Sequence, residues 1–354
     1  MAVFFTGFPG FLGSAIVERL VERGDDVTCL VQSAYRRQAE TRADRIDGPG
    51  SVELVEGDVT EDDLGLGGAY ESLQGETDEV FHLAAVYDLA VDREVGMEIN
   101  VEGTHNVLDF AEGCPLDRFH YVSTCYVSGR YDGRFGEDHL VEGQQFNNHY
   151  ETTKYLAEVA VQDRMTAGVP ATIYRPAIVV GDSDTGATQK YDGPYFLLRW
   201  LLRQPTVATV NTVAGAGDCE INVVPRDFVV DAIAALSDRA DAVGDVYQLC
   251  DPNPLSVSEM VDVLADATDR QVVQVPLPKC VAKGMLERVP GVRRLTGIEP
   301  ATIDYFDHPT RYDCERTRDV LAESDVTCPP FASYVDAMVS FVREHPEVTP
   351  DPMT

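Results

Sequence analysis

The chain has 354 residues, with 60 acidic side chains against 28 basic ones and a formal net charge of −32. This length suffices for one large domain or two modest ones around a substantial core. The acidic excess argues against a nucleic-acid partner, because phosphate contact requires a basic face. Molar salt, at which the Debye length is about 3 Å, would screen the self-repulsion, so the composition indicates a halophilic protein.

The eight cysteines are spaced singly along the chain. We expect them to be small buried hydrophobes in a reducing compartment, with no metal site. We expect no signal peptide before the first apolar run, which starts at Val3. No stretch approaches the roughly 18 uninterrupted apolar residues of a membrane span. We therefore predict a cytoplasmic protein, either a monomer or a homodimer.

Short apolar runs alternate with amphipathic segments through the first half of the chain. Such alternation predicts an α/β fold with a doubly wound parallel Rossmann sheet covered on both faces. The clearest helical patterns span about 97–112 and 150–167. The expected strands are 3–6, 27–31, 52–56, 80–83, 119–122 and 171–174.

The alternation of apolar runs and amphipathic segments becomes less regular from about Asp182. Beyond this point helices are expected near 194–203, 226–237, 256–267 and 331–344. We predict that these form a smaller, mostly helical substrate lobe, while a strand at 246–249 returns to the main sheet. The predicted domains are 1–181 plus about 220–250 for dinucleotide binding, and about 182–219 plus 251–354 for the substrate lobe and C-terminal helices.

A glycine-rich turn follows the first strand directly and opens an amphipathic helix. In such a loop Gly7 permits the tight turn, Gly10 admits a pyrophosphate and Gly13 allows close helix packing. The helix amino end offers free N–H groups to the phosphates. We predict that this loop binds the cofactor through Thr6, Gly7, Phe8, Pro9, Gly10, Phe11, Leu12 and Gly13.

The end of the second strand bears on the choice between NAD and NADP. A carboxylate there would hold the ribose 2′-hydroxyl of NAD, but the chain has Gln32, followed closely by Arg36 and Arg37. Guanidinium groups bind phosphate as planar forks. We therefore favour NADP(H), with NAD(H) still open, because both arginines could also belong to a solvated helix face.

Tyr150 and Lys154 form a Tyr-x-x-x-Lys pair in a chain with only four lysines. On a helix the two side chains share a face, and a nearby ammonium favours the phenolate. Tyr150 would then be a usable general acid/base. The alternative is an exposed pair on a solvated helix.

Taken together, the glycine-rich loop, the order of the elements and the Tyr-x-x-x-Lys pair resemble those of the extended short-chain dehydrogenase/reductases. The resemblance covers about residues 1–250. The resemblance implies hydride transfer with Tyr150 as acid/base, Lys154 on the nicotinamide ribose, and a hydroxyl from Thr124 or, as second choice, Ser123. It also implies a structural and proton-relay role for Asn100. Further cofactor contacts are implied for Asp58, Val59, Leu83, Ala84, Ala85 and Val122.

The run from Tyr174 to Gly186 resembles the thioester-reductase and fatty acyl-CoA reductase branch, of the male-sterility type. Pro176 and Ala177 stand where nucleotide-sugar enzymes usually carry an Asn, and the resemblance places Pro176, Ile178 and Val179 at the cofactor. It implies reduction of a carbonyl or acyl thioester on an apolar substrate. Alternatives are a nucleotide-sugar epimerase/dehydratase, a 3β-hydroxysteroid or dihydroflavonol-type dehydrogenase, and a non-catalytic NAD(P) sensor.

Two further features bear on the substrate. Tyr87, Thr124 and Tyr191 are candidate substrate contacts by position. The segment 279–294 carries five cations and one acid. We expect an amphipathic basic lid for an acyl-CoA or a lipid surface, with peripheral membrane contact, or alternatively a helix whose cations pair with acidic neighbours.

Overall fold

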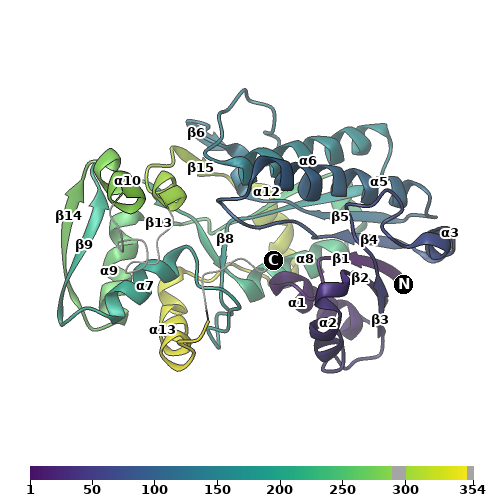
Figure 1. Cartoon of the computed structure of the whole chain (residues 1–354), viewed down its shortest axis with the longest axis horizontal. Helices are drawn as coiled ribbons and strands as arrows, with labels where there is room; N and C mark the ends of the chain where they lie inside the picture. Colours follow the sequence, from purple (N-terminus) through teal and green to yellow (C-terminus); the bar gives the residue numbers. More distant parts are fainter. Residues whose placement is uncertain (289–299, 349–354) are drawn as a thin grey trace.

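The computed structural model describes residues 1–288 and 300–348. Its centre is a seven-stranded parallel sheet in the order β12-β7-β5-β4-β1-β2-β3 (Figure 1). The order reverses between β1 and β4, which makes the carboxyl ends of these two strands the expected ligand crevice. The strands are β1 (Ala2–Thr6), β2 (Asp26–Val31), β3 (Ser51–Glu56), β4 (Glu79–His82), β5 (Arg118–Val122), β7 (Ala171–Pro176) and β12 (Val246–Leu249).

Helices cover both faces of this sheet (Figure 1), which confirms the predicted fold class. One face carries α5 (Gly103–Glu112) and α6 (His149–Ala167) over a core that includes Val107 and Phe119. The other face carries α1 (Phe11–Arg23), α2 (Arg36–Ala43) and α8 (Arg226–Ser237). The short helices α3 (Tyr70–Glu76) and α4 (Arg93–Gly96) lie between β3 and α5 in the chain. The last two strand residues of β12 pair with Arg175 and Pro176 of β7.

The predicted helix over 97–112 is interrupted. Its first part, η3 (Met97–Glu102), is a π-helical turn that continues into α5. Such turns occur frequently at functional sites, because the extra residue redirects side chains. Asn100 lies in this turn and is almost completely buried.

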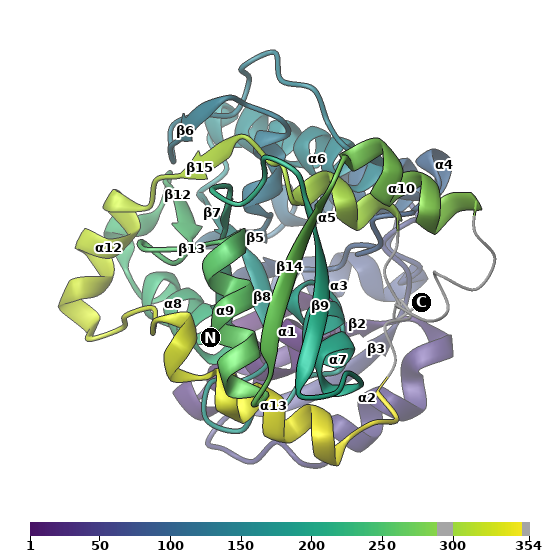
Figure 2. The ribbon, with the colours of Figure 1, turned by 90° about the vertical axis from the view of Figure 1, so that its left-hand side faces the viewer.

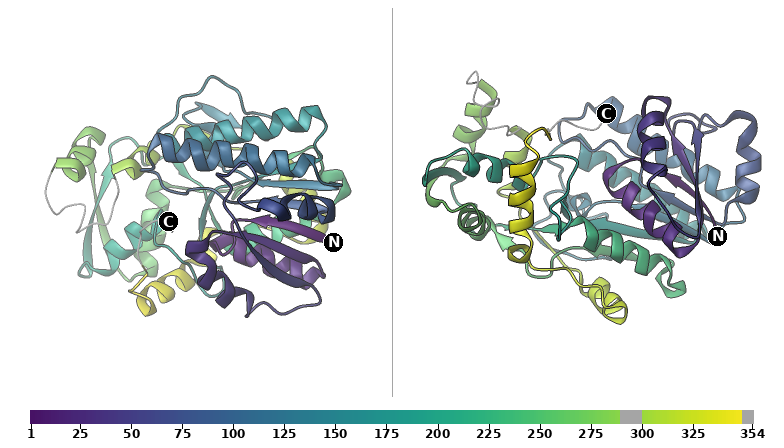
Figure 3. Two further views of the ribbon diagram at one scale, coloured as in Figure 1. Left: turned by 45° about the vertical axis from the view of Figure 1, so that its right-hand side comes forward. Right: turned by 90° about the horizontal axis from the view of Figure 1, so that it is seen from below.

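The remaining described residues include a smaller lobe beside the carboxyl edge of the sheet (Figure 1 and Figure 3). It contains α7 (Pro194–Leu202), α9 (Val257–Ala267) and α13 (Val335–Glu344), which share one apolar core. These three agree with predicted helices, whereas α8, also predicted, packs on α1 instead. The lobe also holds a parallel ribbon of β9 (Val207–Val213) and β14 (Gln271–Leu277), shown in front in Figure 2, which the mostly helical prediction missed.

Shorter elements tie the lobe to the sheet. β8 (Ile178–Val180) pairs with β11 (Val223–Pro225), and β6 (Gly133–Phe135) pairs with β15 (Thr310–Tyr312). β10 (Glu220–Ile221) pairs antiparallel with β13 (Leu255–Ser256). α10 (Lys279–Arg288) and α12 (Glu315–Leu321) complete the elements used below. Among the described residues, no helix is long and apolar enough to cross a membrane.

Candidate active site

The phosphate loop packs so tightly that its glycines are required. Gly7 has a φ of +100°, and a Cβ there would lie 2.8 Å from the Cβ of Leu83. A Cβ on Gly13 would lie 2.3 Å from the carbonyl oxygen of Gly7. The first bond of the α1 ladder runs from the Ser14 N–H to the Gly10 carbonyl at 2.9 Å. The Gly10 N–H already donates to the Gly7 carbonyl at 2.9 Å, so the N–H groups of Phe11, Leu12 and Gly13 are the ones left for an anion, and this cradle fits a pyrophosphate.

A pocket of about 290 Å³ lies at the carboxyl ends of β2 and β3, where an adenosine would be expected. Asp58 accepts a hydrogen bond from Gln32 Nε2 at 2.8 Å, so two predicted cofactor residues meet here. Val59 instead is buried under α5, where its carbonyl accepts from Asn106. The pocket is lined by Gln32, Ser33, Glu56, Gly57, Asp58 and Gly65.

Arg36 and Arg37 were predicted to read a 2′-phosphate, but Arg36 is already engaged. Its Nε donates to Glu40 at 2.9 Å and its Nη1 donates to the Leu54 carbonyl at 3.1 Å. Arg37 is exposed. One turn further along α2, burial and the like charges of neighbouring arginines lower the pKa of Arg42. Sequence reasoning missed Arg42, because nothing in the local pattern distinguishes it from the other arginines of α2.

Arg226 is the main like charge near Arg42. Its guanidinium carbon lies 5.2 Å from the ring centre of Phe11, the first residue of α1. The amide of Gln189, turned so that its oxygen faces α2, accepts from Arg42 at 2.9 Å. The loop before α7 therefore meets α2 beside the phosphate loop, and two guanidiniums gather there.

The segment after β4 runs beneath the phosphate loop. The Thr6 hydroxyl accepts from the Ala84 N–H at 3.2 Å. Asn100 holds the continuation of this segment, because its Oδ1 accepts from the Val86 N–H at 2.8 Å. Its Nδ2 donates to the Thr153 hydroxyl at 3.0 Å. Asn100 thus ties the chain beyond Leu83, Ala84 and Ala85 to the helix that carries Tyr150.

Thr124, Tyr150 and Lys154 lie together where β5 ends and α6 begins. The Thr124 side chain lies beside the Tyr150 hydroxyl and acts to lower its pKa, and the Thr124 hydroxyl donates to the Pro176 carbonyl at 3.5 Å. Lys154 is almost fully buried and donates to the carbonyl of Val122 at 3.0 Å. The three groups form a compact acid/base constellation.

The lowered Tyr150 pKa that the i,i+4 spacing predicts does not appear. Burial raises the pKa of Tyr150 above its usual value, although the neighbouring Thr124 side chain opposes this. Burial also lowers the pKa of Lys154 to about 7, while Glu158 opposes that shift. The Lys154 ammonium is turned towards β5, so helical spacing alone misjudged which partner the lysine meets.

Ser123, the second candidate hydroxyl, has a different partner. Its Oγ donates to Glu158 Oε2 at 2.5 Å. Glu158 also receives Arg175 Nε at 3.0 Å, and all three side chains are buried. Gln162 donates to the same carboxylate. Ser123 therefore belongs to a buried ion-pair network that joins β5, β7 and α6.

The amino end of α6 is held by groups that sequence reasoning did not single out. Asn148 caps the helix by accepting from the Glu151 N–H at 2.9 Å. Its Nδ2 donates to the Tyr305 hydroxyl at 2.9 Å, and Tyr305 opposes the rise in the Glu151 pKa that burial causes. These contacts connect residues 300–305 of the C-terminal part to the turn that carries Tyr150. Asn148 directly before a helical pattern could have been identified in the sequence as an N-cap, whereas no local pattern points to Tyr305.

The two tyrosines predicted to contact the substrate have different surroundings. Tyr87 is 46% exposed, and its ring meets that of Tyr150 edge-on at 5.3 Å. Lys190 Nζ lies 4.7 Å from the centre of the Tyr87 ring. Tyr191 is fully buried in the lobe core, with its hydroxyl donating to the His345 carbonyl at 2.8 Å. Tyr191 thus lies in the lobe core, whereas the neighbouring, half-buried Lys190 lies over Tyr87.

The remaining predicted cofactor positions, Ile178 and Val179, lie half-buried in β8. In the basic segment, Lys279 binds Asp307 at 2.8 Å and Lys283 binds Asp304 at 2.7 Å. Both lysines thus pair with acidic neighbours, as the alternative interpretation held. Arg293, Arg294 and the rest of the segment beyond Arg288 lie outside the described residues.

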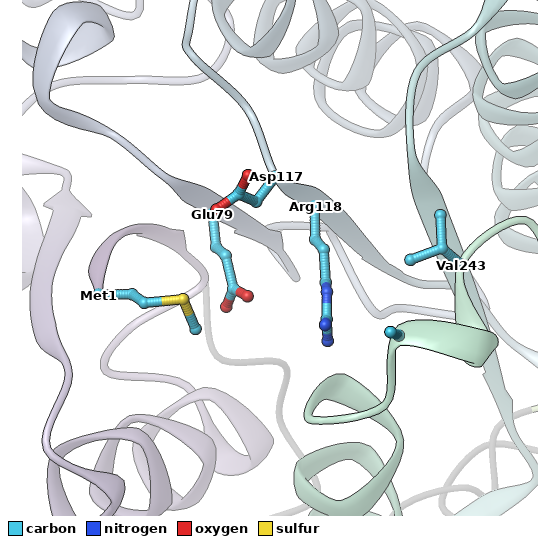
Figure 4. A pocket seen from close by; sticks show the side chains of 6 residues that line it. Met1, Glu79, Asp117, Arg118 and Val243 are labelled. Carbon is cyan, nitrogen blue, oxygen red and sulfur yellow. The ribbon is translucent and has the colours of Figure 1, made fainter.

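A second cavity, of about 290 Å³, lies at the opposite, amino end of the strands. Figure 4 shows Glu79 and Arg118 beside each other there, with Met1 and Val243 at its sides. This cavity is remote from the phosphate loop along the strands. Within the described ranges, no cluster of three or more His, Cys, Asp or Glu side chains could hold a metal ion.

The fold and this edge of the sheet define an oxidoreductase of the extended short-chain dehydrogenase/reductase class, which uses NAD(P). The chain belongs to the male sterility protein family, whose model matches residues 5–233. In a solved structure, the terminal R domain from the myxalamid biosynthetic pathway is similar, with a TM-score of 0.83 and 26% identity. That likeness covers 97% of this chain and 90% of the R domain.

Two relatives differ in the share of their own length that this chain matches. A component of the linear gramicidin synthase of Brevibacillus parabrevis is 26% identical over 73% of this chain, but the match covers only 5% of that much longer protein. Low-salt glycan biosynthesis protein Agl12 of Haloferax volcanii is 30% identical over 75% of this chain and 82% of its own length. The predicted resemblance of this chain to the thioester-reductase branch of the extended short-chain dehydrogenase/reductases is thus confirmed.

Proposed function

We propose that the protein is an NADP-preferring reductase of a carbonyl or acyl-thioester group on a largely apolar substrate. The observation that carries this proposal is the grouping of buried Thr124, Tyr150 and Lys154 at the end of β5. The bound dinucleotide would supply the hydride, while the chain supplies position, charge and the proton.

Each side chain then has a distinct task. The Thr124 hydroxyl donates to the substrate oxygen and stabilises the charge that develops there. Tyr150 transfers its proton to that oxygen, and its raised pKa keeps the proton available at neutral pH. Asn100 holds the segment after β4 in place. A tyrosine that stays protonated suits the reductive direction.

For the cofactor preference we favour Arg42 over Arg36 and Arg37 as the 2′-phosphate ligand. Burial beside Arg226 is unfavourable for the Arg42 charge, and a bound dianion would relieve this cost. Glu56, which lines the adenosine pocket, works against a phosphate and in favour of a ribose hydroxyl. Kinetics with both cofactors therefore test this assignment directly.

A second candidate is a nucleotide-sugar epimerase or dehydratase. The observation in its favour is the 30% identity to Agl12, a glycan biosynthesis protein, over 82% of its length. Pro176 followed by Ala177 weighs against it, since the sugar-nucleotide enzymes that this segment resembles usually carry an Asn there. NAD that stays bound through purification, detected by its absorbance after denaturation, would favour this candidate.

The deciding experiment is a screen for NADPH and NADH oxidation in molar KCl with acyl-CoAs, aldehydes and ketones. We expect turnover with NADPH and at least one apolar carbonyl or thioester. Tyr150→Phe should lower kcat by about a thousandfold or more while NADPH binding persists. Tyr155→Phe, on the same helix, is the matched control. Unchanged turnover in Tyr150→Phe would refute the assigned acid/base role.

A further inference from the structure

A row of buried polar groups runs from Lys154 through the sheet to the phosphate loop. Lys154 Nζ donates to the Tyr121 hydroxyl at 3.0 Å, and it lies 4.6 Å from the centre of the same ring. The Thr104 side chain lies beside the Tyr121 hydroxyl and opposes the rise in its pKa that burial causes. Thr104 Oγ1 lies 3.0 Å from His82 Nε2, and His82 Nδ1 lies 2.7 Å from Thr6 Oγ1.

The partners of Thr104 and His82 allow one arrangement of protons. Thr104 donates its only hydroxyl proton to the Asn100 carbonyl at 2.6 Å, so it accepts from His82. Burial lowers the pKa of His82 to about 3, so its imidazole is neutral. Nε2 then donates to Thr104, and Nδ1 accepts from Thr6.

Lys154 is the charged end of this row of buried polar groups. The other groups that face it are the Val122 carbonyl from β5, Glu158 from its own helix, and His82, which is neutral, from β4. The Tyr121 hydroxyl is therefore one of two uncharged acceptors on β5 that contact the ammonium directly. Removing it would withdraw a hydrogen bond from a buried cation, which favours loss of the proton.

We propose that Tyr121 is a positioning residue for Lys154, with its hydroxyl accepting from the ammonium, and that Thr104, which His82 holds, keeps this hydroxyl in place from behind. The hydroxyl keeps Lys154 charged and aimed at the carboxyl end of β5. For catalysis, this inference rests on the proposed function, since Lys154 must act with Tyr150. The contact between Tyr121 and Lys154 itself does not depend on the reaction.

The chain offers a matched control on the opposite face of the sheet. Tyr174 is also fully buried, and its hydroxyl lies 2.9 Å from His120 Nδ1. Tyr121 packs in the core under α5 and α6, whereas Tyr174 packs in the core under α1 and α8. Replacing either tyrosine by Phe removes one buried hydroxyl, but only Tyr121→Phe removes an acceptor from Lys154.

The direct test is NMR on protein labelled with ¹³Cε-lysine, because the chain has only four lysines. Lys154→Met assigns the Lys154 signal, and its pH titration gives the ammonium pKa without any turnover. We expect Tyr121→Phe to lower that pKa by about one unit, and Thr104→Val to lower it less. Tyr174→Phe should leave it at the wild-type value. Equal titrations in the wild type and Tyr121→Phe would overturn the proposal.

The kinetic test follows the loss of kcat/KM at alkaline pH in molar KCl. If charged Lys154 is required, Tyr121→Phe moves this loss to lower pH by the shift that NMR measures, and Tyr174→Phe leaves it in place. An NMR shift without any change in the rate profile would reject the catalytic part of the inference. Failure of the proposed function is distinguishable, because it appears as full activity in Tyr150→Phe while the NMR result stands.

Discussion

The Ser123 hydroxyl donates to Glu158 at 2.5 Å, whereas the adjacent Thr124 hydroxyl meets Tyr150. Two neighbouring hydroxyls just beyond the end of β5 thus have different partners, although both partners lie on α6. One serves the ion pair between β5, β7 and α6. The other remains beside the proposed acid.

This contrast predicts different outcomes for two alanine variants. Thr124→Ala should lower kcat/KM by roughly a hundredfold or more with little change in Tm, since it removes a donor to the developing charge. Ser123→Ala should cost about 1–3 kcal/mol of unfolding free energy, because Glu158 loses a buried donor. Rate assays and thermal melts of both variants check this. A larger rate loss in Ser123→Ala than in Thr124→Ala would reverse the assignment.

Lys154→Met should abolish turnover and raise stability at neutral pH by about 1–3 kcal/mol. Burial lowers the Lys154 pKa from 10.5 to about 7, so between these values the unfolded chain binds more protons. The cost of burying Lys154 is therefore complete below pH 7 and fades as the pH rises towards 10.5. Urea unfolding at pH 6.5 and 9.5 measures the gain, which should be larger at pH 6.5. A gain independent of pH contradicts the lowered pKa.

Arg42→Ala should raise KM for NADPH by about tenfold or more and leave KM for NADH nearly unchanged. Arg36→Ala is the control, since Arg36 is bonded to Glu40 and the Leu54 carbonyl. Initial rates with both cofactors for wild type and variants provide the comparison. A wild-type enzyme that prefers NADH would remove the basis for this prediction.

Arg175→Met should destabilise the fold by about 3–5 kcal/mol, because it leaves the buried Glu158 carboxylate without its cation. The double variant with Glu158→Leu should recover much of that loss, as no unpaired charge remains. Denaturant unfolding of the two single variants and the double variant completes the cycle. Strictly additive losses would show that the pair does not act as a unit.

The net charge of −32 predicts a salt requirement. Tm should rise steeply between 0.1 and 2 M KCl, since counterions screen the repulsion among the carboxylates. Sucrose at matched water activity controls for general exclusion effects. A Tm that is flat in KCl would refute the halophilic interpretation.

The sequence by itself was sufficient for what depends on local pattern. Strand and helix periodicity predicted the parallel sheet, and Gly7, Gly10 and Gly13 predicted the phosphate loop at its edge. Tyr150 and Lys154 were found by their spacing on one helix. These features are readable because the chemistry needs particular residues at fixed offsets within one element.

Only the tertiary structure decided which side chains meet across elements. It turned Lys154 to Tyr121 on β5, Ser123 to Glu158 on α6, and Asn148 to Tyr305 from the C-terminal part. It also buried Tyr191 and paired Lys279 with Asp307. Such pairs depend on register between strands and on the packing of helices over the sheet. Because those distances join residues remote in the chain, no local pattern records them.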